Sequence, residues 1–353
     1  MEHTHNKKVT IVGTMSGTSL DGLDICIVTF LPDSYTIVHA ETISYSNTLK
    51  ELLQNAHTLC GLELSQLHID YGVFCGKSIH SVLQKTKIHA DYIVSHGHTV
   101  FHTPHTGLTL QIGSGAHIAK QAGVSTIYNL RELDVAFGGQ GAPLVPMGDE
   151  FLFASYDYCL NIGGFANMST KRNGIRVAWD ICLANIGINS LAQTYYNKDF
   201  DESGAIGRSG NVHEPLLHDL QTLPYYTQSP PKSLGREWVE SEVFPLLHSY
   251  TISAADRIRT LYEHCAMQIG STLSQENTQT LCTGGGVHNT FLMERIAAHT
   301  KSKLIVPDTQ VINFKEALIF AYLGYLRIQH KPNCLASVTG AEKDVCGGDI
   351  IFV

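Results

Sequence analysis

One order of predicted elements occurs twice along this chain of 353 residues, and it constrains the fold more than any single motif. In each half an apolar strand is followed by a glycine turn and two further strands, and then by alternating helices and strands. The opening strands are Val9–Val12 and Leu23–Val28 in one half, and Tyr158–Ile162 and Ala166–Thr170 in the other. Such an order predicts a mixed sheet with helices on its faces. The sequence therefore predicts a duplicated, two-lobed α/β molecule with a ligand site in a cleft between the lobes.

The glycine turn of the first half is unusually rich in groups that bind phosphate. Residues 13–24 read GTMSGTSLDGLD, with the chain's densest run of glycines, hydroxyls and carboxylates. Glycines let the backbone approach an anion closely, and unshielded N–H groups bind phosphate oxygens. Asp21 and Asp24 add carboxylates that suit a magnesium ion beside the phosphates. An ordinary glycine-rich hairpin turn is the alternative for this segment.

Two other glycine segments follow predicted strands. Gly163-Gly164 occupies the equivalent turn of the second half. Thr283-Gly284-Gly285-Gly286 joins a strand to a predicted helix, a junction that can contact a flat ring or a phosphate, or can serve only as a tight turn. The P-loop motif is absent, and Gly113-Ser114-Gly115 does not continue into a dinucleotide-binding fingerprint.

Composition excludes several classes of protein. A formal net charge of −8 argues against a nucleic-acid binder, which usually carries a basic stripe. No apolar run is long enough for a membrane span, and the N-terminus resembles no signal peptide, so we expect a cytoplasmic protein. The nine cysteines include no C-x-x-C pair, and those such as Cys26, Cys159 and Cys282 lie in apolar strands. We expect them to be reduced core residues rather than disulfides or zinc ligands.

Asp180 is a candidate general base from its position alone. It follows the predicted strand Ile175–Trp179, at the end that faces the expected cleft. A helix N-cap is the alternative role for an aspartate at such a place.

A histidine cluster offers a competing interpretation. His96, His98, His102 and His105 form H-x-H-x3-H-x2-H, a density typical of metal centres. No acidic residue nearby completes a two-metal set, so a sugar-contacting or structural role is favoured over zinc.

With the three glycine loops in place, the chain resembles the two-lobed, ribonuclease H-like ATPases of the sugar kinase, actin and heat-shock chaperone superfamily. More closely, it resembles the anhydro-N-acetylmuramic acid kinases. The resemblance is carried by nine segments in order, which span nearly the whole chain: MSGTSLDGLD (15–24), SHGHTVFH (95–102), TLQIG (109–113), GGQGAPLVP (138–146), LNIGGFANMS (160–169), KSLGRE (232–237), TGGGVHN (283–289), EALIFAYLG (316–324) and SVTGA (337–341).

The resemblance implies a kinase of cell-wall (peptidoglycan) recycling. Such enzymes open 1,6-anhydro-N-acetylmuramic acid, an amino sugar, with water and transfer the γ-phosphate of ATP to O6, giving N-acetylmuramic acid 6-phosphate. A carboxylate must deprotonate the water, while magnesium and backbone donors neutralise the phosphate charge. The implied partners are this small-molecule sugar and a second copy of the chain in a homodimer, with no nucleic acid and no membrane.

The resemblance also implies roles for individual residues, because the family's functional residues match positions of this sequence. Asp180 matches the catalytic base, and Asp24 is the expected ligand of magnesium. The residues implied to bind ATP are Gly17, Thr18, Ser19, Leu20, Asp21, Gly22, Leu23, Asp24, Gly163, Gly164, Asn167, Gly284, Gly285 and Gly286. Those implied to bind the sugar are His96, His98, Arg131, Asn185 and Glu316.

The chain departs from the family pattern at several places near the expected sugar site, Ser114 and Asn189 among them. The family's usual segment after the base is close to DTGPGN, whereas this chain reads DICLAN from Asp180 to Asn185 and so lacks the glycines. Arg131 alone remains of several arginines expected before GGQGAP, and it would pair with the lactyl carboxylate. His98 stands where a glutamine is usual. A degenerate ATP-binding regulator or a kinase of a related anhydro sugar is therefore the alternative, ahead of a metallohydrolase.

Other segments have open roles. The aromatic residues Trp179, Trp238 and Tyr225-Tyr226 form either core or a carbohydrate platform, and core is favoured. Lys232, Gly235 and Arg236 in KSLGRE either position phosphate or sugar or lie in a solvated loop. We predict one lobe from residues 1–127 and 331–353 and the other from residues 128–330, with a loop-rich insertion near 200–255.

Overall fold

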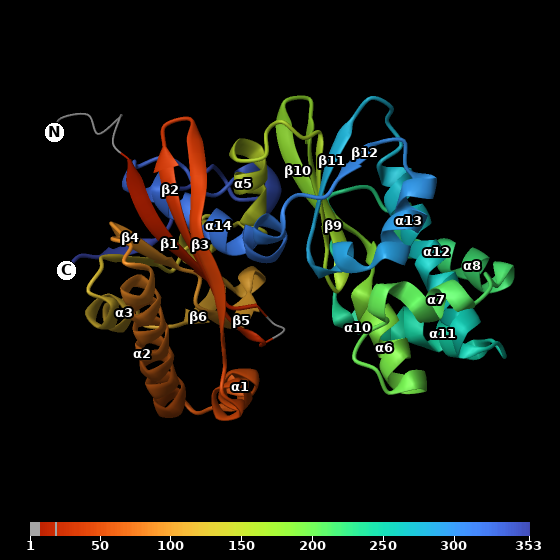
Figure 1. Cartoon of the computed structure of the whole chain (residues 1–353), viewed down its shortest axis with the longest axis horizontal. Helices are drawn as coiled ribbons and strands as arrows, with labels where there is room; N and C mark the ends of the chain where they lie inside the picture. The colour runs from red at the N-terminus through yellow and green to blue at the C-terminus, as the bar shows by residue number, and fades with distance from the viewer. Residues whose placement is uncertain (1–7, 18–19) are drawn as a thin grey trace. The chain divides into compact units, whose positions relative to one another are not determined.

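A computed structural model describes residues 8–17 and 20–353, which cluster into two compact units. The first unit comprises residues up to Phe151 together with Phe314–Val353, and the second comprises Leu152–Asn313 (Figure 1). The predicted boundaries at residues 127 and 330 differ from this division. Residues 145–151 and 314–322 contact each other within the first unit, where Lys315 Nζ lies 2.8 Å from Asp149 Oδ1 and Phe151 packs on Tyr322.

The first unit contains a six-stranded mixed sheet in the order β13-β7-β4-β1-β2-β3. β1 pairs antiparallel with β2 and β2 with β3, whereas β1, β4 and β7 run parallel. The strands are β1 (Val9–Met15), β2 (Gly22–Leu31), β3 (Ser34–Ser44), β4 (Tyr92–Ser95), β7 (Thr126–Tyr128) and β13 (Asp349–Ile351), with a separate hairpin of β5 (His98–Thr103) and β6 (Leu108–Ile112).

Two layers of helix cover this sheet because its central strands are apolar on both faces. On one face Leu23, Ile25 and Ile27 of β2 share a buried cluster with residues of α2 such as Tyr71 and Ile79. On the other face Phe30 stacks on Tyr325 of α14, with ring centroids 4.9 Å apart. The helices of this unit are α1 (Asn47–Gln54), α2 (Gly61–Thr86), α3 (Gly115–Ala122), α4 (Glu132–Ala136), α5 (Val145–Phe151), α15 (Ala336–Thr339) and most of α14 (Thr309–Ile328).

The second unit repeats this strand order, which confirms the predicted duplication. Its sheet runs β10-β9-β8-β11-β12, with β8, β9 and β10 antiparallel and β8, β11 and β12 parallel. This matches β3-β2-β1-β4-β7 of the first unit strand for strand. The strands are β8 (Tyr158–Ile162), β9 (Phe165–Arg172), β10 (Ile175–Leu183), β11 (Gln279–Thr283) and β12 (Lys303–Ile305). The expected cleft between the lobes stays a prediction.

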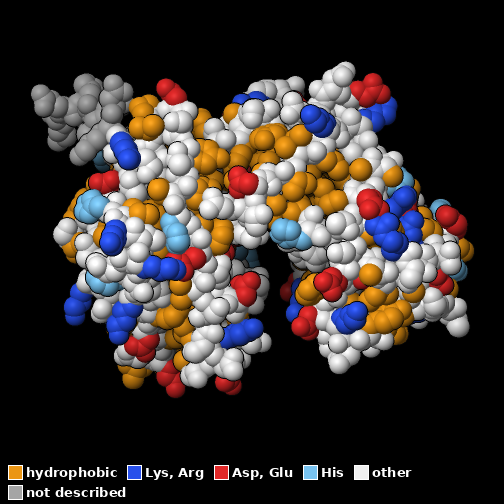
Figure 2. All heavy atoms as spheres, viewed as in Figure 1, with side chains coloured by type: hydrophobic (Ala, Val, Ile, Leu, Met, Phe, Trp, Pro, Cys, Tyr) orange, Lys and Arg blue, Asp and Glu red, His pale blue; other side chains and the backbone are white. Residues whose placement is uncertain are grey.

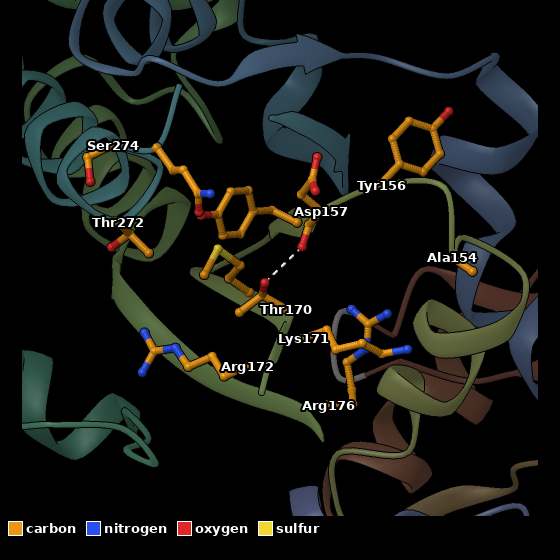
Figure 3. A pocket seen from close by; sticks show the side chains of 12 residues that line it. Ala154, Tyr156, Asp157, Thr170, Lys171, Arg172, Arg176, Thr272 and Ser274 are labelled. Atoms are coloured by element: carbon orange, nitrogen blue, oxygen red, sulfur yellow. Dashed lines mark hydrogen bonds between the residues drawn. The ribbon is translucent and has the colours of Figure 1, made fainter. Parts of the chain in front are cut away.

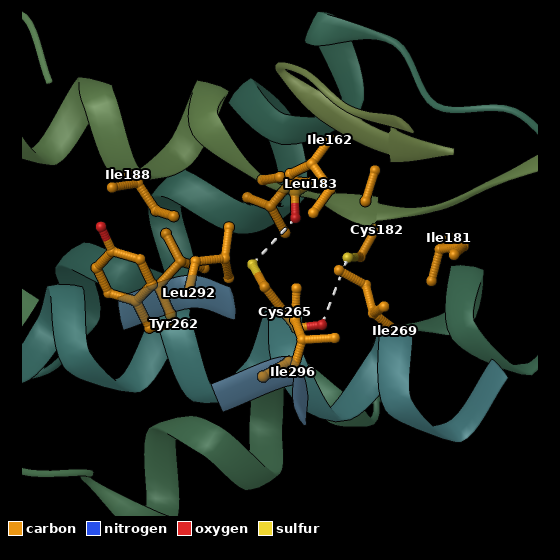
Figure 4. Packing of buried hydrophobic residues seen from close by; sticks show 14 of the residues in the cluster. Ile162, Ile181, Cys182, Leu183, Ile188, Tyr262, Cys265, Ile269, Leu292 and Ile296 are labelled. Atoms are coloured by element: carbon orange, nitrogen blue, oxygen red, sulfur yellow. Dashed lines mark hydrogen bonds between the residues drawn. The ribbon is translucent and has the colours of Figure 1, made fainter. Parts of the chain in front are cut away.

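Helices cover one face of the second sheet around a large apolar core. Ile162, Cys182 and Leu183 of the sheet pack with Cys265 and Ile269 of α12, and the Cys265 thiol donates to the Leu183 carbonyl oxygen at 3.0 Å (Figure 4). The helices are α6 (Asn185–Tyr196), α7 (Ala205–Ser209), α8 (Glu214–Gln221), α9 (Pro224–Thr227), α10 (Arg236–Trp238), α11 (Phe244–Ser249), α12 (Ala254–Thr272) and α13 (Thr290–His299).

Several local predictions can be compared with this fold. The segment near 200–255 consists of short helices rather than loops alone, and its leucines and valines complete the core. Trp179 and Tyr225 are buried, as the favoured core role predicts. Cys26, Cys159 and Cys282 are buried, which confirms that they are core residues.

Candidate active site

The first glycine turn joins β1 to β2, and its leucines pack inward. The hairpin register places Met15 opposite Asp24, and the Leu20 amide donates to the Gly17 carbonyl oxygen at 3.3 Å. Leu20 and Leu23 belong to the buried cluster beneath the sheet, so a ligand on the outside of the turn would meet their backbone rather than their side chains. The predicted ligands Thr18 and Ser19 lie outside the described residues.

Asp24 is a half-buried carboxylate on β2. Thr42 of β3 donates to its Oδ1 at 2.6 Å. Burial raises the pKa of Asp24, the Thr42 bond acts in the opposite direction, and the charge of Asp21 raises the pKa further. Two carboxylates that repel each other beside a glycine turn form a donor set that suits a hard cation. In the described part of the chain no three metal-ligating side chains come together, the histidine cluster included.

A buried hydrogen-bond chain lies next to the first turn and includes His98. Tyr45 donates to Ser16 Oγ at 2.8 Å, and its hydroxyl lies 2.9 Å from that of Tyr71. Ser16 Oγ lies 3.3 Å from His98 Nδ1. Burial lowers the pKa of His98 and raises that of Tyr45 to about 12, so these groups are neutral near pH 7. Neutral polar side chains thus hold Ser16, which lies at the start of the turn.

His96 and Arg131 form a pair in the same unit. Arg131 donates to His96 Nε2 from Nε at 3.0 Å and lies 2.8 Å from it through Nη2, and its Nη1 donates to the Gly141 carbonyl oxygen at 2.6 Å. His96 Nδ1 lies 2.9 Å from the Gly97 carbonyl oxygen, which makes Nδ1 the protonated nitrogen and Nε2 the acceptor. Burial lowers the pKa of Arg131 to about 10, a value that leaves the guanidinium charged.

Glu316 lies inside α14 rather than near its start. The predicted helix began at Lys315, but Asp308 accepts a hydrogen bond from the Val311 amide, and the helix therefore begins at Thr309. The Glu316 side chain is exposed by surface area, yet the protein atoms around it raise its pKa, with Arg131 and Lys315 acting in the opposite direction.

Asp134 is a structural residue of this region that the sequence analysis did not single out. Its fully buried carboxylate accepts from the Gly141 amide at 2.7 Å and from the Thr339 hydroxyl at 2.8 Å. The Cys334 thiol donates to the same carboxylate. Asp134 therefore ties the GGQGAP segment to the SVTGA segment. The short segment around it, ELDVA from Glu132 to Ala136, gave no signal of this role.

In the second unit, three polar residues form a row across neighbouring strands. Asn161 of β8 pairs with Asn167 of β9, and Asn167 pairs with Asp180 of β10. Residues that pair across strands present their side chains on one face. Asn167 and Asp180 were predicted site residues, whereas Asn161 was missed, although its place two residues before Gly163 was a usable signal.

The second glycine turn contacts the start of α6. The Gly164 carbonyl oxygen accepts from the amides of Ala184 and Ile186, and the Gly163 carbonyl oxygen accepts from the amide of Asn185. Asn185 is thus the first residue of α6 and lies directly beside this turn. A side chain at Gly163 or Gly164 would meet no atom closer than 3.7 Å, so the outer side of the turn is open to a ligand.

The third glycine segment follows β11 and packs against the same row. Gly284 has a φ of 84°, and a Cβ there would lie 2.6 Å from Asn161 Oδ1, so only glycine fits. Gly285 faces open space. The three predicted ATP segments of the second unit, at residues 163–164, 167 and 284–286, therefore lie at one end of one sheet.

Asp180 lies at a β-bulge within β10, three residues before the strand ends. The prediction placed it just after a strand ending at Trp179, and it was wrong on this point because Ile181, Cys182 and Leu183 are apolar and enter the core. The Leu234 amide donates to Asp180 Oδ2 at 2.8 Å. Burial raises the pKa of Asp180, and the Leu234 bond acts in the opposite direction. A half-buried carboxylate of raised pKa is suited to general-base chemistry.

A separate pocket of about 550 Å³ lies at the other end of these strands. Lys171, Arg172 and Arg176 line it with Asp157, and Thr170 donates to the Asp157 carbonyl oxygen (Figure 3). Arg176 stands near the beginning of β10 and Asp180 near its end. The pocket is therefore distinct from the predicted site.

The visible surface carries charged side chains of both signs (Figure 2). Cationic and anionic side chains are interspersed on the visible face of the described residues, and no continuous basic stripe crosses it (Figure 2). Among residues 8–17 and 20–353, the structure contains no helix with the length and apolar character of a membrane span.

Two sheets of one strand order, each with a glycine turn between its first two strands, define the actin-like fold class, which includes the sugar kinases. Within that class the chain belongs to the anhydro-N-acetylmuramic acid kinase family, whose model matches residues 9–353. A Vibrio cholerae protein named anhydro-N-acetylmuramic acid kinase is 35% identical over 366 residues, covering 97% of this chain and 98% of that protein. One of the same name from Mannheimia succiniciproducens is 33% identical over 369 residues, with the same coverage.

Solved structures resemble the chain more distantly. The activator of the 2-hydroxyisocaproyl-CoA dehydratase from Clostridium difficile, with bound ADPNP, has a TM-score of 0.43 at 16% identity and covers 91% of this chain and 97% of its own. A ROK family glucokinase from Streptomyces griseus, in complex with glucose and AMPPNP, has a TM-score of 0.40 at 9% identity, with coverages of 89% and 98%.

Proposed function

We propose that this chain is an ATP-dependent kinase that opens 1,6-anhydro-N-acetylmuramic acid with water and phosphorylates its O6, giving N-acetylmuramic acid 6-phosphate in cell-wall recycling. Family membership and the names of full-length relatives support this activity. The single observation in the structure that carries it is the half-buried carboxylate of Asp180, which is held through one oxygen and lies in a polar row with Asn167.

Asp180 would act as the general base. It takes a proton from a water molecule whose oxygen forms a bond to C1 of the sugar, while the C1–O6 bond breaks. O6 then forms a bond to the γ-phosphorus, and ADP leaves. Asp180 Oδ2 accepts from Leu234, whereas Oδ1 accepts no hydrogen bond from the described residues and is available for the proton.

ATP would be bound through the backbone of the glycine turns. Residues 17–24, Gly163, Gly164, Asn167 and residues 284–286 are the proposed ligands, and the open sides of Gly163 and Gly285 leave room for them to approach phosphate or nucleoside. Asp24 would hold Mg²⁺, assisted by Asp21. Magnesium is commonly bound by one or two protein carboxylates plus substrate phosphates, and it would neutralise phosphate charge.

Four residues are the proposed ligands of the sugar. Arg131 is the proposed partner of the lactyl carboxylate, although three of its donor contacts already go to His96 and Gly141, which leaves two N–H groups for a ligand. His96, Asn185 and Glu316 remain proposed sugar-binding residues. His98 was expected to bind the sugar as well, but its buried position and its contact with Ser16 support an indirect role for it. We further propose a cytoplasmic homodimer.

The proposal is tested by incubating the protein with Mg·ATP and the anhydro sugar and analysing products by mass spectrometry. We expect a sugar 6-phosphate that contains one added water, with one ADP per product. A parallel reaction with 1,6-anhydro-N-acetylglucosamine, which lacks the lactyl group, tests the role of Arg131. Tight ATP binding without product from either sugar would contradict the proposal and support a non-catalytic regulator.

A further inference from the structure

A short segment of the second unit holds Asp180 by three hydrogen bonds. The segment runs from Pro224 to Trp238 and is called the capping segment below. The Tyr225 hydroxyl donates to the Asp180 carbonyl oxygen at 2.6 Å, and the Asp180 amide donates to the Lys232 carbonyl oxygen at 3.0 Å. The Leu234 amide donates to Asp180 Oδ2 at 2.8 Å. Both main-chain polar groups and one carboxylate oxygen of Asp180 are thus bound by a segment more than forty residues away.

The sheet explains why Asp180 needs these partners. β10 is the edge strand of its sheet, so its outward N–H and C=O groups have no neighbouring strand. The pairing of β10 with β9 is also interrupted between Asp180 and Cys182 by the bulge. A polar backbone group without a partner costs free energy when it is buried. The capping segment supplies these partners at the bulged position.

Tyr225 is itself held firmly. Its side chain is buried, and its ring lies 5.4 Å from that of Trp238. Lys232 Nζ donates to the Tyr225 carbonyl oxygen at 3.0 Å and lies 4.5 Å from the ring centroid. Burial raises the pKa of Tyr225 well above its usual range, so the hydroxyl stays a donor at neutral pH. Trp238 and Lys232 therefore fix the Tyr225 ring so that its hydroxyl points toward Asp180.

We propose that the capping segment positions Asp180 for its reaction, with Tyr225 as the positioning residue and the Leu234 amide as the fixed donor that leaves Oδ1 to take the proton. This inference rests on the proposed function, because it assumes that Asp180 is the base. The titratable groups that face Asp180 are Tyr225 of α9, Lys232 of the loop and Cys182 of β10.

The test compares Tyr225→Phe with Tyr226→Phe. Tyr226 is a matched control because it is the adjacent tyrosine, and its buried hydroxyl has no hydrogen-bond partner among the described residues. We expect Tyr225→Phe to lower kcat roughly 5- to 50-fold, less than the 10²-fold that misplacing a group by about 1 Å costs. The KM for ATP should change less than about twofold, and Tyr226→Phe should leave both constants unchanged.

The pH profile gives a second readout that a purely structural role would not move. The Leu234 amide bond lowers the pKa of Asp180, against the raising effect of burial. If Tyr225→Phe loosens the segment, that bond weakens and the pKa of Asp180 rises. The acidic limb of kcat should therefore shift to higher pH in Tyr225→Phe and stay in place in Tyr226→Phe.

Asp180→Asn separates failure of this inference from failure of the proposed function. If Asp180→Asn is inactive, while Tyr225→Phe keeps the full rate and an unmoved acidic limb, the positioning role is overturned and the proposed base stands. If Asp180→Asn keeps its activity, the proposed base fails and the inference falls with it. If the base and the positioning role are both correct, the double variant Asp180→Asn/Tyr225→Phe should be no slower than Asp180→Asn, because Tyr225 acts only through Asp180.

A further pair of variants covers the case in which Tyr225→Phe folds poorly. Lys232→Met removes the ammonium group that holds Tyr225, while Lys232→Arg keeps a cationic donor. We expect Lys232→Met to lower kcat in the same direction and Lys232→Arg to recover most of the loss. Equal, wild-type rates in both variants, measured well below their midpoints of thermal unfolding, would contradict the inference.

Discussion

Asp180→Asn is the substitution that most directly tests the chemistry of this site. The asparagine keeps the size of the side chain, and its amide oxygen can still accept from the Leu234 amide. The main-chain bonds of residue 180 to Tyr225 and Lys232 do not involve the carboxylate and stay in place. The substitution therefore removes the proton acceptor and little else.

The expected loss follows from the value of a general base. Such a group contributes about 10²- to 10⁴-fold, which corresponds to about 2.7–5.5 kcal/mol of activation free energy. Because burial raises the pKa of Asp180, its charge is not well stabilised by the fold, and the neutral amide should leave the free energy of unfolding unchanged or slightly higher. Affinity for ATP should barely change.

The assay is ADP release in the presence of the anhydro sugar, with ATP affinity from calorimetry and stability from thermal unfolding. Asp157→Asn is a matched control, since Asp157 also accepts one backbone amide bond, from Gln279 at 2.8 Å, but lies at the other end of the strands. We expect full turnover for this control. A turnover of Asp180→Asn within a few-fold of wild type would refute the assignment, and Glu316 would be the next candidate.

Three further substitutions test other parts of the structure. Asp24→Asn keeps an acceptor for Thr42 but loses a charge, and should raise the KM for Mg·ATP about tenfold, which is about 1.4 kcal/mol; unchanged KM across a magnesium titration would exclude Asp24 as the ligand. Arg131→Lys cannot reproduce the fork on His96 or the bond to Gly141, and should lower the free energy of unfolding by about 1–3 kcal/mol and raise the sugar KM, as denaturant titration and steady-state kinetics would show. Burial alone would raise the pKa of Glu263, but bonds from Arg295, His299 and Arg259 lower it to about 2, so its ionised form stabilises the fold above pH 4.5 and this contribution disappears as pH falls toward 2. Glu263→Gln should therefore cost about 3 kcal/mol at pH 7 and much less near pH 2, and an equal cost at both pH values would contradict this account.

The duplicated sheet could be predicted because local signals and tertiary contacts agree there. Glycine turns separate apolar strands in both halves, and the observed sheets have one strand order. The ends of helices and the boundary between the units were harder to predict. α14 begins six residues before the predicted start because the side chain of Asp308 caps it, and residues 128–151 belong with the first unit through long-range contacts such as Lys315 with Asp149.

Residues whose hydrogen-bond partners are far away in the sequence could not be predicted from the local sequence pattern. Asp134 binds Gly141 nearby but also Thr339 and Cys334, about 200 residues away. Nothing in the sequence around Asp134 indicates those contacts. Asn161 could have been considered, because the sequence places it two residues before Gly163. Only its pairing with Asn167 in the structure shows that it belongs to the polar row.

The departure from DTGPGN and the capping segment have a common physical basis. Glycine and proline after the base would favour a turn, whereas Ile181, Cys182 and Leu183 continue β10 and are buried in the core. The proposed base is therefore presented by a bulge in an edge strand, and an edge strand leaves its outward backbone groups to be satisfied by other segments. Tyr225 and Lys232 satisfy them at Asp180. The altered segment after Asp180, taken alone, favours loss of activity. It occurs together with contacts that fix the Asp180 carboxylate, and we therefore expect Asp180 to work as a base in a sugar site of changed shape.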